Sequence, residues 1–258
     1  GMRTDNYWVL DAMSIDKARM RNRASMDLWL EMSRKPWYQD QEPDCINGYR
    51  GQMVDVYIND QHMGIYHLCE RIGRKQLKLK KYNVSNGGIR GLLYKSESWE
   101  ATHPFYYYIR PFPADTVDQW KGIAVNYPEM DEGDSITWQP LLQFMEYVRS
   151  TSYTNIQPTI QDYLDMPVYI DYVLFCDLLS ARDNEGKNIY WSYYDKNISN
   201  KALVSLWDID RGEGNTTASR RFIQDAIPII FIGNSFKQAP FTTHYVVATV
   251  ICGNAYSK

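Results

Sequence analysis

Three oxygen-bearing side chains stand at the ends of two strand-like segments in the second half of the sequence. Asp183 follows an apolar helical pattern, Asn188 comes just before the first segment, and Asp208 comes just after the second. The segments 189–194 and 202–207 have similar lengths, so we expect them to pair as an antiparallel hairpin. This hairpin places Asn188 opposite the neighbourhood of Asp208, and the three oxygen donors converge.

The chemistry that suits such a set is phosphoryl transfer assisted by a divalent cation. Hard cations such as Mg²⁺ bind carboxylate and amide oxygens and keep room for phosphate oxygens. A carboxylate that the metal does not use can accept a hydroxyl proton. The pattern Arg182-Asp183-x-x-x-x-Asn188 with the later Asp208 is the order in which protein kinases place a catalytic base, a metal-binding amide and a metal-binding carboxylate.

Structural interpretations compete with this one. Asp183 and Asn184 could only shape a loop with Gly186, and Asp208 and Asp210 could only cap a turn.

A run of lysines follows the first predicted hairpin and also has two interpretations. A solvated face is the simpler one and an anion site is the alternative; the residues are Lys75, Lys78, Lys80 and Lys81. The four histidines show no ligand spacing for zinc.

Segment 14–34 has a helical pattern, with Ser14 as its expected N-cap. Its apolar residues recur every four positions and form one stripe, made of Met20, Ala24, Leu28 and Met32. Arg21 falls within that stripe, so we expect it to point toward the core. A buried guanidinium needs an anion, which is either a protein carboxylate or a bound phosphate.

The remaining elements are strands first and helices later, which indicates an α+β protein. Lys95 shares a strand face with Leu93, and Glu70 shares one with Tyr66 and Leu68. The predicted strands are 54–58, 65–70 and 92–95, and a six-residue loop joins the first two. Segment 99–137 is predicted as loop and short strand. The predicted helices are 140–149 and 165–179.

Composition sets the class of protein. The 258 residues are 44% hydrophobic and 23% charged, which is typical of a globular chain of one large domain or two small lobes. A net charge of −3 gives no attraction of the whole chain to nucleic acid, which leaves a local basic patch open. No apolar run is long enough for a membrane helix. The four cysteines form no Cys-x-x-Cys pair, which leaves the redox compartment open.

Five ordered blocks together resemble the CotH kinase family, named for spore coat protein H and distantly similar to protein kinases. The resemblance covers roughly residues 7–215. The blocks are Tyr7-Trp8-Val9-Leu10 with Arg21-Asn22, Val54-Asp55-Val56-Tyr57-Ile58-Asn59 with Gly64-Ile65-Tyr66 and Glu70, Leu93-Tyr94-Lys95, Arg182-Asp183 with Asn188, and Trp207-Asp208-Ile209-Asp210 with Gly214-Asn215.

The resemblance implies ATP-dependent phosphorylation of protein serine or threonine with Mg²⁺ or Mn²⁺, in bacterial coat, surface or exported proteins. It implies Asp183 as the catalytic aspartate, Asn188 and Asp208 as metal ligands, and Lys95 with Glu70 as an ATP-positioning pair. Asp210 is a further candidate metal ligand. Arg21 joins the nucleotide-binding candidates if its anion is a phosphate.

It further suggests a single atypical protein-kinase-like domain over 1–258, truncated at both ends, with a β-rich ATP-binding part (1–135) and a helical, catalytic part (136–258) that contains the hairpin. The sequence has no signal peptide, but its leading Gly1-Met2 is typical of a cloning remnant, so we do not infer a cytosolic protein. An alternative function is an inactive surface module that binds glycan or protein through the aromatic run 99–108.

Overall fold

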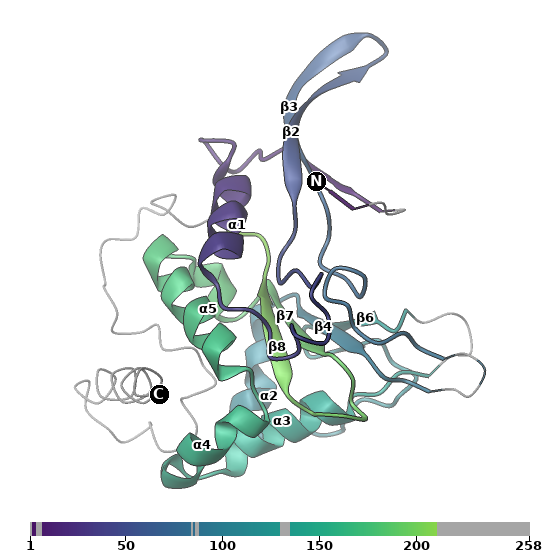
Figure 1. Ribbon diagram of the computed structural model, residues 1–258, viewed down its shortest axis with the longest axis vertical. Coiled ribbons are helices and arrows are strands. Elements are labelled where there is room, and N and C mark those ends of the chain that lie inside the picture. The colour runs from purple at the N-terminus through teal and green to yellow at the C-terminus, as the bar shows by residue number, and fades with distance from the viewer. Residues whose placement is uncertain (1, 4–6, 84, 86–87, 130–134, 211–258) are drawn as a thin grey trace.

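The computed structural model describes residues 2–3, 7–83, 85, 88–129 and 135–210 and shows a mixed α/β protein with two antiparallel sheets (Figure 1). The strands are β1 (Val9–Asp11), β2 (Gly51–Ile58), β3 (Gln61–Cys69), β4 (Leu92–Ser96), β5 (Gln119–Trp120), β6 (Ile123–Tyr127), β7 (Ile189–Tyr193) and β8 (Ala202–Leu206). The α-helices are α1 (Arg21–Met32), α2 (His103–Tyr106), α3 (Gln139–Ser150), α4 (Tyr153–Thr159) and α5 (Met166–Leu179), and the 3₁₀ helices are η2 (Trp99–Thr102), η3 (Ile160–Asp162) and η4 (Arg182–Glu185).

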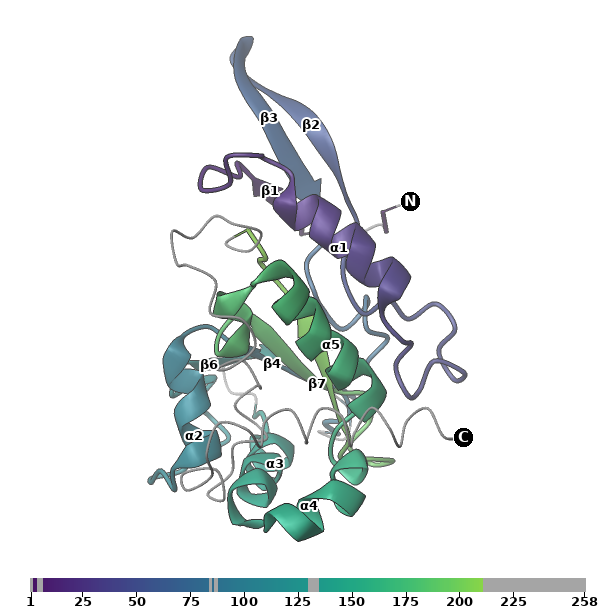
Figure 2. The ribbon, with the colours of Figure 1, turned by 90° about the vertical axis from the view of Figure 1, so that its left-hand side faces the viewer.

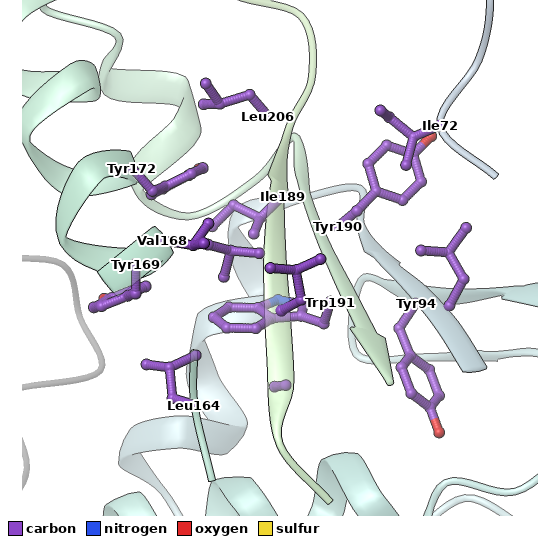
Figure 3. Close-up of a cluster of buried hydrophobic side chains, with 14 of the residues drawn as sticks. Ile72, Tyr94, Leu164, Val168, Tyr169, Tyr172, Ile189, Tyr190, Trp191 and Leu206 are labelled. Carbon is purple, nitrogen blue, oxygen red and sulfur yellow. The ribbon is translucent and has the colours of Figure 1, made fainter. Parts of the chain in front are cut away.

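The larger sheet has the strand order β5-β6-β4-β7-β8 and carries the core. Every residue of β7 and β8 is buried, because both faces of these strands are covered. Helix α5 lies over one face (Figure 2), where its Val168 and Tyr172 approach Ile189 and Trp191, while Tyr190 points to the other side (Figure 3). This explains why the sequences of β7 and β8 are almost continuously apolar and do not alternate between apolar and polar residues.

The larger sheet also takes strands from both sides of residue 135. Strand β4, from the first part of the chain, lies between β6 and β7. The predicted parts 1–135 and 136–258 therefore share this sheet and are not separated by it. No helix in the described part of the chain is long and apolar enough to cross a membrane.

The smaller sheet, ordered β1-β3-β2, projects from the body as a long hairpin (Figure 1). The predicted six-residue loop is wrong, since the turn consists of Asn59 and Asp60 alone, with φ values of 49° and 63°. Positive φ at both central residues is the geometry of a type I′ turn, which matches the twist of paired strands and favours Asn and Asp. The remaining residues of the expected loop extend β3.

Segment 99–137 also differs from its prediction. It contains η2 and α2 in addition to β5 and β6. The helical turns begin within the aromatic run and bury Ala101 and Phe105 in the core, so this part of the run serves packing.

Helix α1 begins later and has a different buried face from the one predicted. Asp16, not Ser14, accepts hydrogen bonds from N–H groups just before and at the start of the helix, those of Ala18 (2.9 Å), Met20 (2.8 Å) and Arg21 (2.8 Å). The helix buries Asn22, Ser25, Met26 and Trp29, whereas Met20, Ala24, Leu28 and Met32 are exposed.

Trp29 determines this orientation of α1. Its ring is completely buried and makes edge contacts with Tyr172 and Phe175 of α5. Its indole N–H donates to the Asn47 carbonyl at 2.6 Å. One large aromatic side chain with a satisfied polar group outweighs a stripe of smaller apolar residues.

Candidate functional site

The hairpin of β7 and β8 brings Asn188 and Asp208 together, as predicted. Ile189 pairs with Leu206, so the residues just outside the strands face each other. The Asn188 amide nitrogen lies 3.4 Å from Asp208 Oδ2. Both residues have left-handed backbones, with φ of 58° and 55°. Asn and Asp tolerate this region better than other non-glycine residues, and such backbones cluster at functional sites.

Asn22 and Asp11 complete this group, and the sequence analysis did not identify them. Asn22 lies in the first turn of α1, is 7% exposed, and its amide nitrogen lies 3.3 Å from Asp11 Oδ2 and 3.4 Å from Asp208 Oδ1. Its oxygen accepts the Ile209 N–H at 2.6 Å. Asp11, Asn22, Asn188 and Asp208 are called the acid–amide cluster below.

The donor set of the acid–amide cluster fits Mg²⁺ or Mn²⁺, which bind oxygen ligands. Asp11 and Asp208 supply carboxylates, and Asn188 has an amide oxygen with no hydrogen-bond partner among the described residues. Asn22 uses its own oxygen for Ile209, so its role is to orient the two carboxylates. No group of three or more His, Cys, Asp or Glu that could hold a metal occurs in the described ranges, so phosphate or water oxygens would complete the shell.

Aromatic rings pack beside the cluster. Tyr49 makes an edge contact with Trp207, with centroids 5.1 Å apart, and Trp207 makes another with Tyr190 at 6.1 Å. Burial raises the pKa of Tyr49 well above its usual value, and the negative charges of Asp208 and Asp11 add to the shift. The Tyr49 hydroxyl is therefore protonated at neutral pH and cannot serve as a base.

Asp183 lies in η4 at the same end of the hairpin. Its carboxylate pairs with Lys187 Nζ at 3.0 Å and is partly exposed. The next residue, Asn184, is buried and donates to the Trp207 carbonyl at 2.7 Å, while its own carbonyl accepts the Tyr172 hydroxyl. Asn184 thereby ties the short helix that carries Asp183 to the residue before Asp208.

Gly186 allows this loop to pack closely. A Cβ at this position would lie 2.2 Å from the Trp99 ring, so a larger residue would displace either the ring or the loop between Asp183 and Asn188. This contact is the physical reason for a glycine within the motif.

Lys95 and Glu70, which the resemblance implies as an ATP-positioning pair, do not contact each other, because each side chain has other protein partners. Glu70 is 2% exposed, and its carboxylate accepts the backbone N–H groups of Arg3 and Arg50 and the Gln76 side-chain amide. These bonds give Glu70 a structural role at the end of β3.

Lys95 points elsewhere. Its ammonium lies 3.8 Å from Glu97 and 5.9 Å from the centre of the Tyr190 ring. Tyr190 contacts Trp207, so Lys95 stays on the side of the sheet where the rings beside the acid–amide cluster lie.

Arg21 has a carboxylate as its anion. Its guanidinium lies 2.6 Å from Asp16, and the two side chains are 15% and 1% exposed. Of the two expected partners, a protein carboxylate is the one present, so the burial of Arg21 needs no phosphate. Arg21 is half-buried and is not among the residues that α1 buries in the core. It lies at the start of the helix beside the capping Asp16, and the predicted stripe is wrong.

Asp210 is half-buried two residues after Asp208, and its role as a metal ligand stays a prediction. Gly214 and Asn215, which also support the resemblance, lie outside the described residues.

Comparison with known proteins identifies the family. The family model described as "CotH kinase protein" matches residues 1–243, nearly the whole chain. A search of curated proteins found no match. The matched range includes every residue of the acid–amide cluster as well as Asp183 and Lys95. The chain therefore belongs to the CotH kinase family.

Proposed function

We propose that this protein is a protein kinase that transfers the γ-phosphoryl group of ATP to serine or threonine hydroxyls with Mg²⁺ or Mn²⁺. The observation that carries the proposal is the convergence of Asp208, Asn188 and Asp11 at the open end of the β7–β8 hairpin. Membership of a kinase family supports the same chemistry. The fold that we propose is distantly related to that of protein kinases.

Each residue has a distinct task in this proposal. Asp208, Asn188 and Asp11 would hold the cation, which when bound neutralises charge on the phosphate oxygens. Asn22 keeps the carboxylates of Asp11 and Asp208 apart and oriented, because one amide group donates to both. Such fixed geometry reduces the cost of organising the site during the reaction.

Asp183 would accept the proton of the substrate hydroxyl. Its carboxylate is accessible from solvent and is held by Lys187, and Asn184 fixes its helix beside Trp207. Lys95 is the candidate cation for positioning ATP phosphates, as a point charge on the same side of the sheet. We do not propose nucleotide contacts for Glu70 or Arg21, because protein groups occupy both side chains.

The substrates that we propose are bacterial coat, surface or exported proteins, and the support is the resemblance of the sequence blocks alone. A test uses the full chain, radiolabelled ATP and a casein-like acceptor, with Mg²⁺ or Mn²⁺ and with a chelator. Metal-dependent label on phosphoserine or phosphothreonine is expected. A chain that binds neither nucleotide nor metal would contradict the proposal.

A second candidate is a binding module on the same fold. The observation in its favour is the exposure of aromatic side chains, with Trp99 45%, Tyr107 55% and Tyr108 57% exposed. Such rings can stack on sugars. A thermal-shift measurement separates the two functions, because ligand binding to the native state raises the melting temperature: Mg²⁺-ATP stabilises a kinase, whereas only glycan stabilises a pure glycan-binding module.

A further inference from the structure

A strongly basic hollow lies at a different place from the acid–amide cluster. Its volume is about 450 Å³, and the residues that the structure describes line it with six cationic side chains, one carboxylate and Leu79. The cations are Arg3, Arg74, Lys75, Lys78, Lys80 and Lys81, and the carboxylate is Glu42. We call it the basic hollow. Two of the lysines, Lys78 and Lys80, alternate with buried leucines in the sequence Leu77-Lys78-Leu79-Lys80-Lys81.

The backbone that carries these lysines is fixed. Leu77 and Leu79 are almost completely buried, and their N–H groups donate to Gly73 and Arg74 carbonyls at 3.0 Å. The Lys80 N–H donates to the Tyr194 carbonyl at 3.0 Å. The lysine side chains therefore project from a rigid backbone segment. This rigidity reduces the conformational entropy that is lost when an anion binds.

The one carboxylate that the described residues contribute to the basic hollow is already engaged. Glu42 accepts hydrogen bonds from Lys80 at 2.7 Å and from the Tyr194 hydroxyl at 3.0 Å. The hydrogen bond from Lys80 lowers the pKa of Glu42, and the charge of Lys78 contributes. Glu42 thus orients Lys80 without cancelling the remaining positive charge.

Lys78 is the side chain best placed to take an external anion. Its backbone has φ of 53°, a strained value for lysine that the surrounding structure must stabilise. The residue is half-buried, and its ammonium has no hydrogen bond or ion pair with any residue that the structure describes. Holding several cations close together without a bound anion is electrostatically unfavourable.

The basic hollow and the acid–amide cluster lie at opposite ends of one strand. Lys80 bonds to Tyr194, just after β7, whereas Asn188 comes just before it. A strand of this length spans about 17 Å. A ligand in the basic hollow therefore leaves the proposed catalytic site open.

We propose that the basic hollow binds a phosphoryl group carried by a phosphoserine or phosphothreonine of a polypeptide. The phosphoryl chemistry follows from the excess of positive charge, since a dianion with several acceptor oxygens can engage more of these cations than a single carboxylate. The choice of a polypeptide as its source rests on the proposed function. A protein substrate that is already phosphorylated would be held there while another hydroxyl approaches Asp183.

The test measures binding of a fluorescent phosphoserine peptide and its serine counterpart to the full chain, in chelator so that no metal contributes. The phosphopeptide should bind at least about tenfold more tightly. The double variant Lys78→Gln/Lys81→Gln should lose about tenfold of that affinity. The matched variant Lys17→Gln/Lys121→Gln makes the same change of charge at exposed positions and should bind like the unmodified chain.

Three outcomes would overturn the proposal: equal binding of both peptides, no loss in the Lys78/Lys81 variant at an unchanged melting temperature, or equal loss in both double variants. Free phosphoserine is the competitor that separates the sources of the phosphoryl group. If it binds as tightly as the peptide, the polypeptide source is wrong. Asp208→Ala should leave peptide binding intact, so failure of the kinase proposal is distinguishable from failure of this one.

Discussion

The side-chain oxygen of Asn22 accepts the backbone N–H of Ile209 at 2.6 Å, across 187 positions of sequence. The nitrogen of the same amide lies between the carboxylates of Asp11 and Asp208. One buried side chain thus fixes both the path of the chain after β8 and the orientation of two acidic groups.

Replacing Asn22 by Ala should therefore affect stability and ligand binding together. The buried N–H of Ile209 loses its acceptor, which costs about 1–3 kcal/mol of unfolding free energy. Loss of an orienting partner should also weaken Mg²⁺-ATP binding by about tenfold or more. Denaturant unfolding and calorimetric titration measure the two effects. Asn200→Ala, at an exposed position, is the control, and equal ATP affinity in both variants would remove Asn22 from the site.

The two carboxylates after β8 should differ in their effect on metal binding. Asp208 faces Asn188 and Asn22, so Asp208→Ala should abolish metal-dependent ATP binding, whereas Asp210→Ala should only weaken it. Titration of Mg²⁺-ATP into each variant is the measurement, with Asp60→Asn at the exposed hairpin turn as the control. Unchanged affinity in Asp208→Ala would contradict its assignment as a ligand.

Asp183→Asn should separate binding from transfer. The change removes the charge and basicity of the side chain but keeps its size, so ATP affinity should stay within about twofold while phosphoryl transfer falls by about 10²–10⁴-fold. Label incorporation into a protein acceptor gives the rate. Undiminished transfer would show that Asp183 only shapes its loop.

The sequence was sufficient to predict the local part of the site. Asn188 and Asp208 flank two apolar strands with a short connection, and antiparallel pairing of those strands follows from their lengths. The register Ile189 to Leu206 confirms that prediction. The type and approximate position of α3, α5 and β4 followed from equally local patterns.

The contribution of α1 was not predictable in the same way, because it depends on contacts with residues about 140 to 190 positions away in the chain. Counting apolar residues favoured the face of Met20 and Met32, which is exposed. A weak signal did exist, since Asn22, Met26 and Trp29 share one face at spacings of four and three. A polar residue on the face of a buried tryptophan is a sign of a polar partner in the core.

The ion pair of Arg21 with Asp16 should contribute far more to the free energy of unfolding than the ion pair of Arg23 with Asp27 on the same helix. Arg21→Met leaves an almost fully buried carboxylate without its cation, and the expected loss is about 3 kcal/mol. Arg23→Met removes a partly exposed pair with Asp27 and should cost about 0.5 kcal/mol or less. Equal losses in denaturant unfolding would contradict the difference, and a fall in ATP affinity for Arg21→Met alone would restore a nucleotide role for Arg21.

Asp16 should make the stability of the fold depend on pH. Burial opposes its ionisation, but the hydrogen bonds from the N–H groups of Arg21, Ala18 and Met20 and the Arg21 charge outweigh that effect, so its pKa lies below the usual value of 3.8. A carboxylate whose pKa is lower in the folded state stabilises the fold above its unfolded pKa. That stabilisation is lost as pH falls through the folded value.

The charge-neutral variant Asp16→Asn tests this linkage. At pH 7 it should be less stable than the unmodified chain by about 1–3 kcal/mol. The difference should shrink as the pH falls below the usual value of 3.8 toward the lower pKa of the folded carboxylate. Urea unfolding at pH 7, 5 and 3 gives the free energies. Asp27→Asn, in the partly exposed pair with Arg23, is the matched control and should show only a small difference at every pH. A difference for Asp16→Asn that stays constant from pH 7 to 3 would mean that Asp16 stabilises α1 through the shape of its hydrogen bonds and not through its charge.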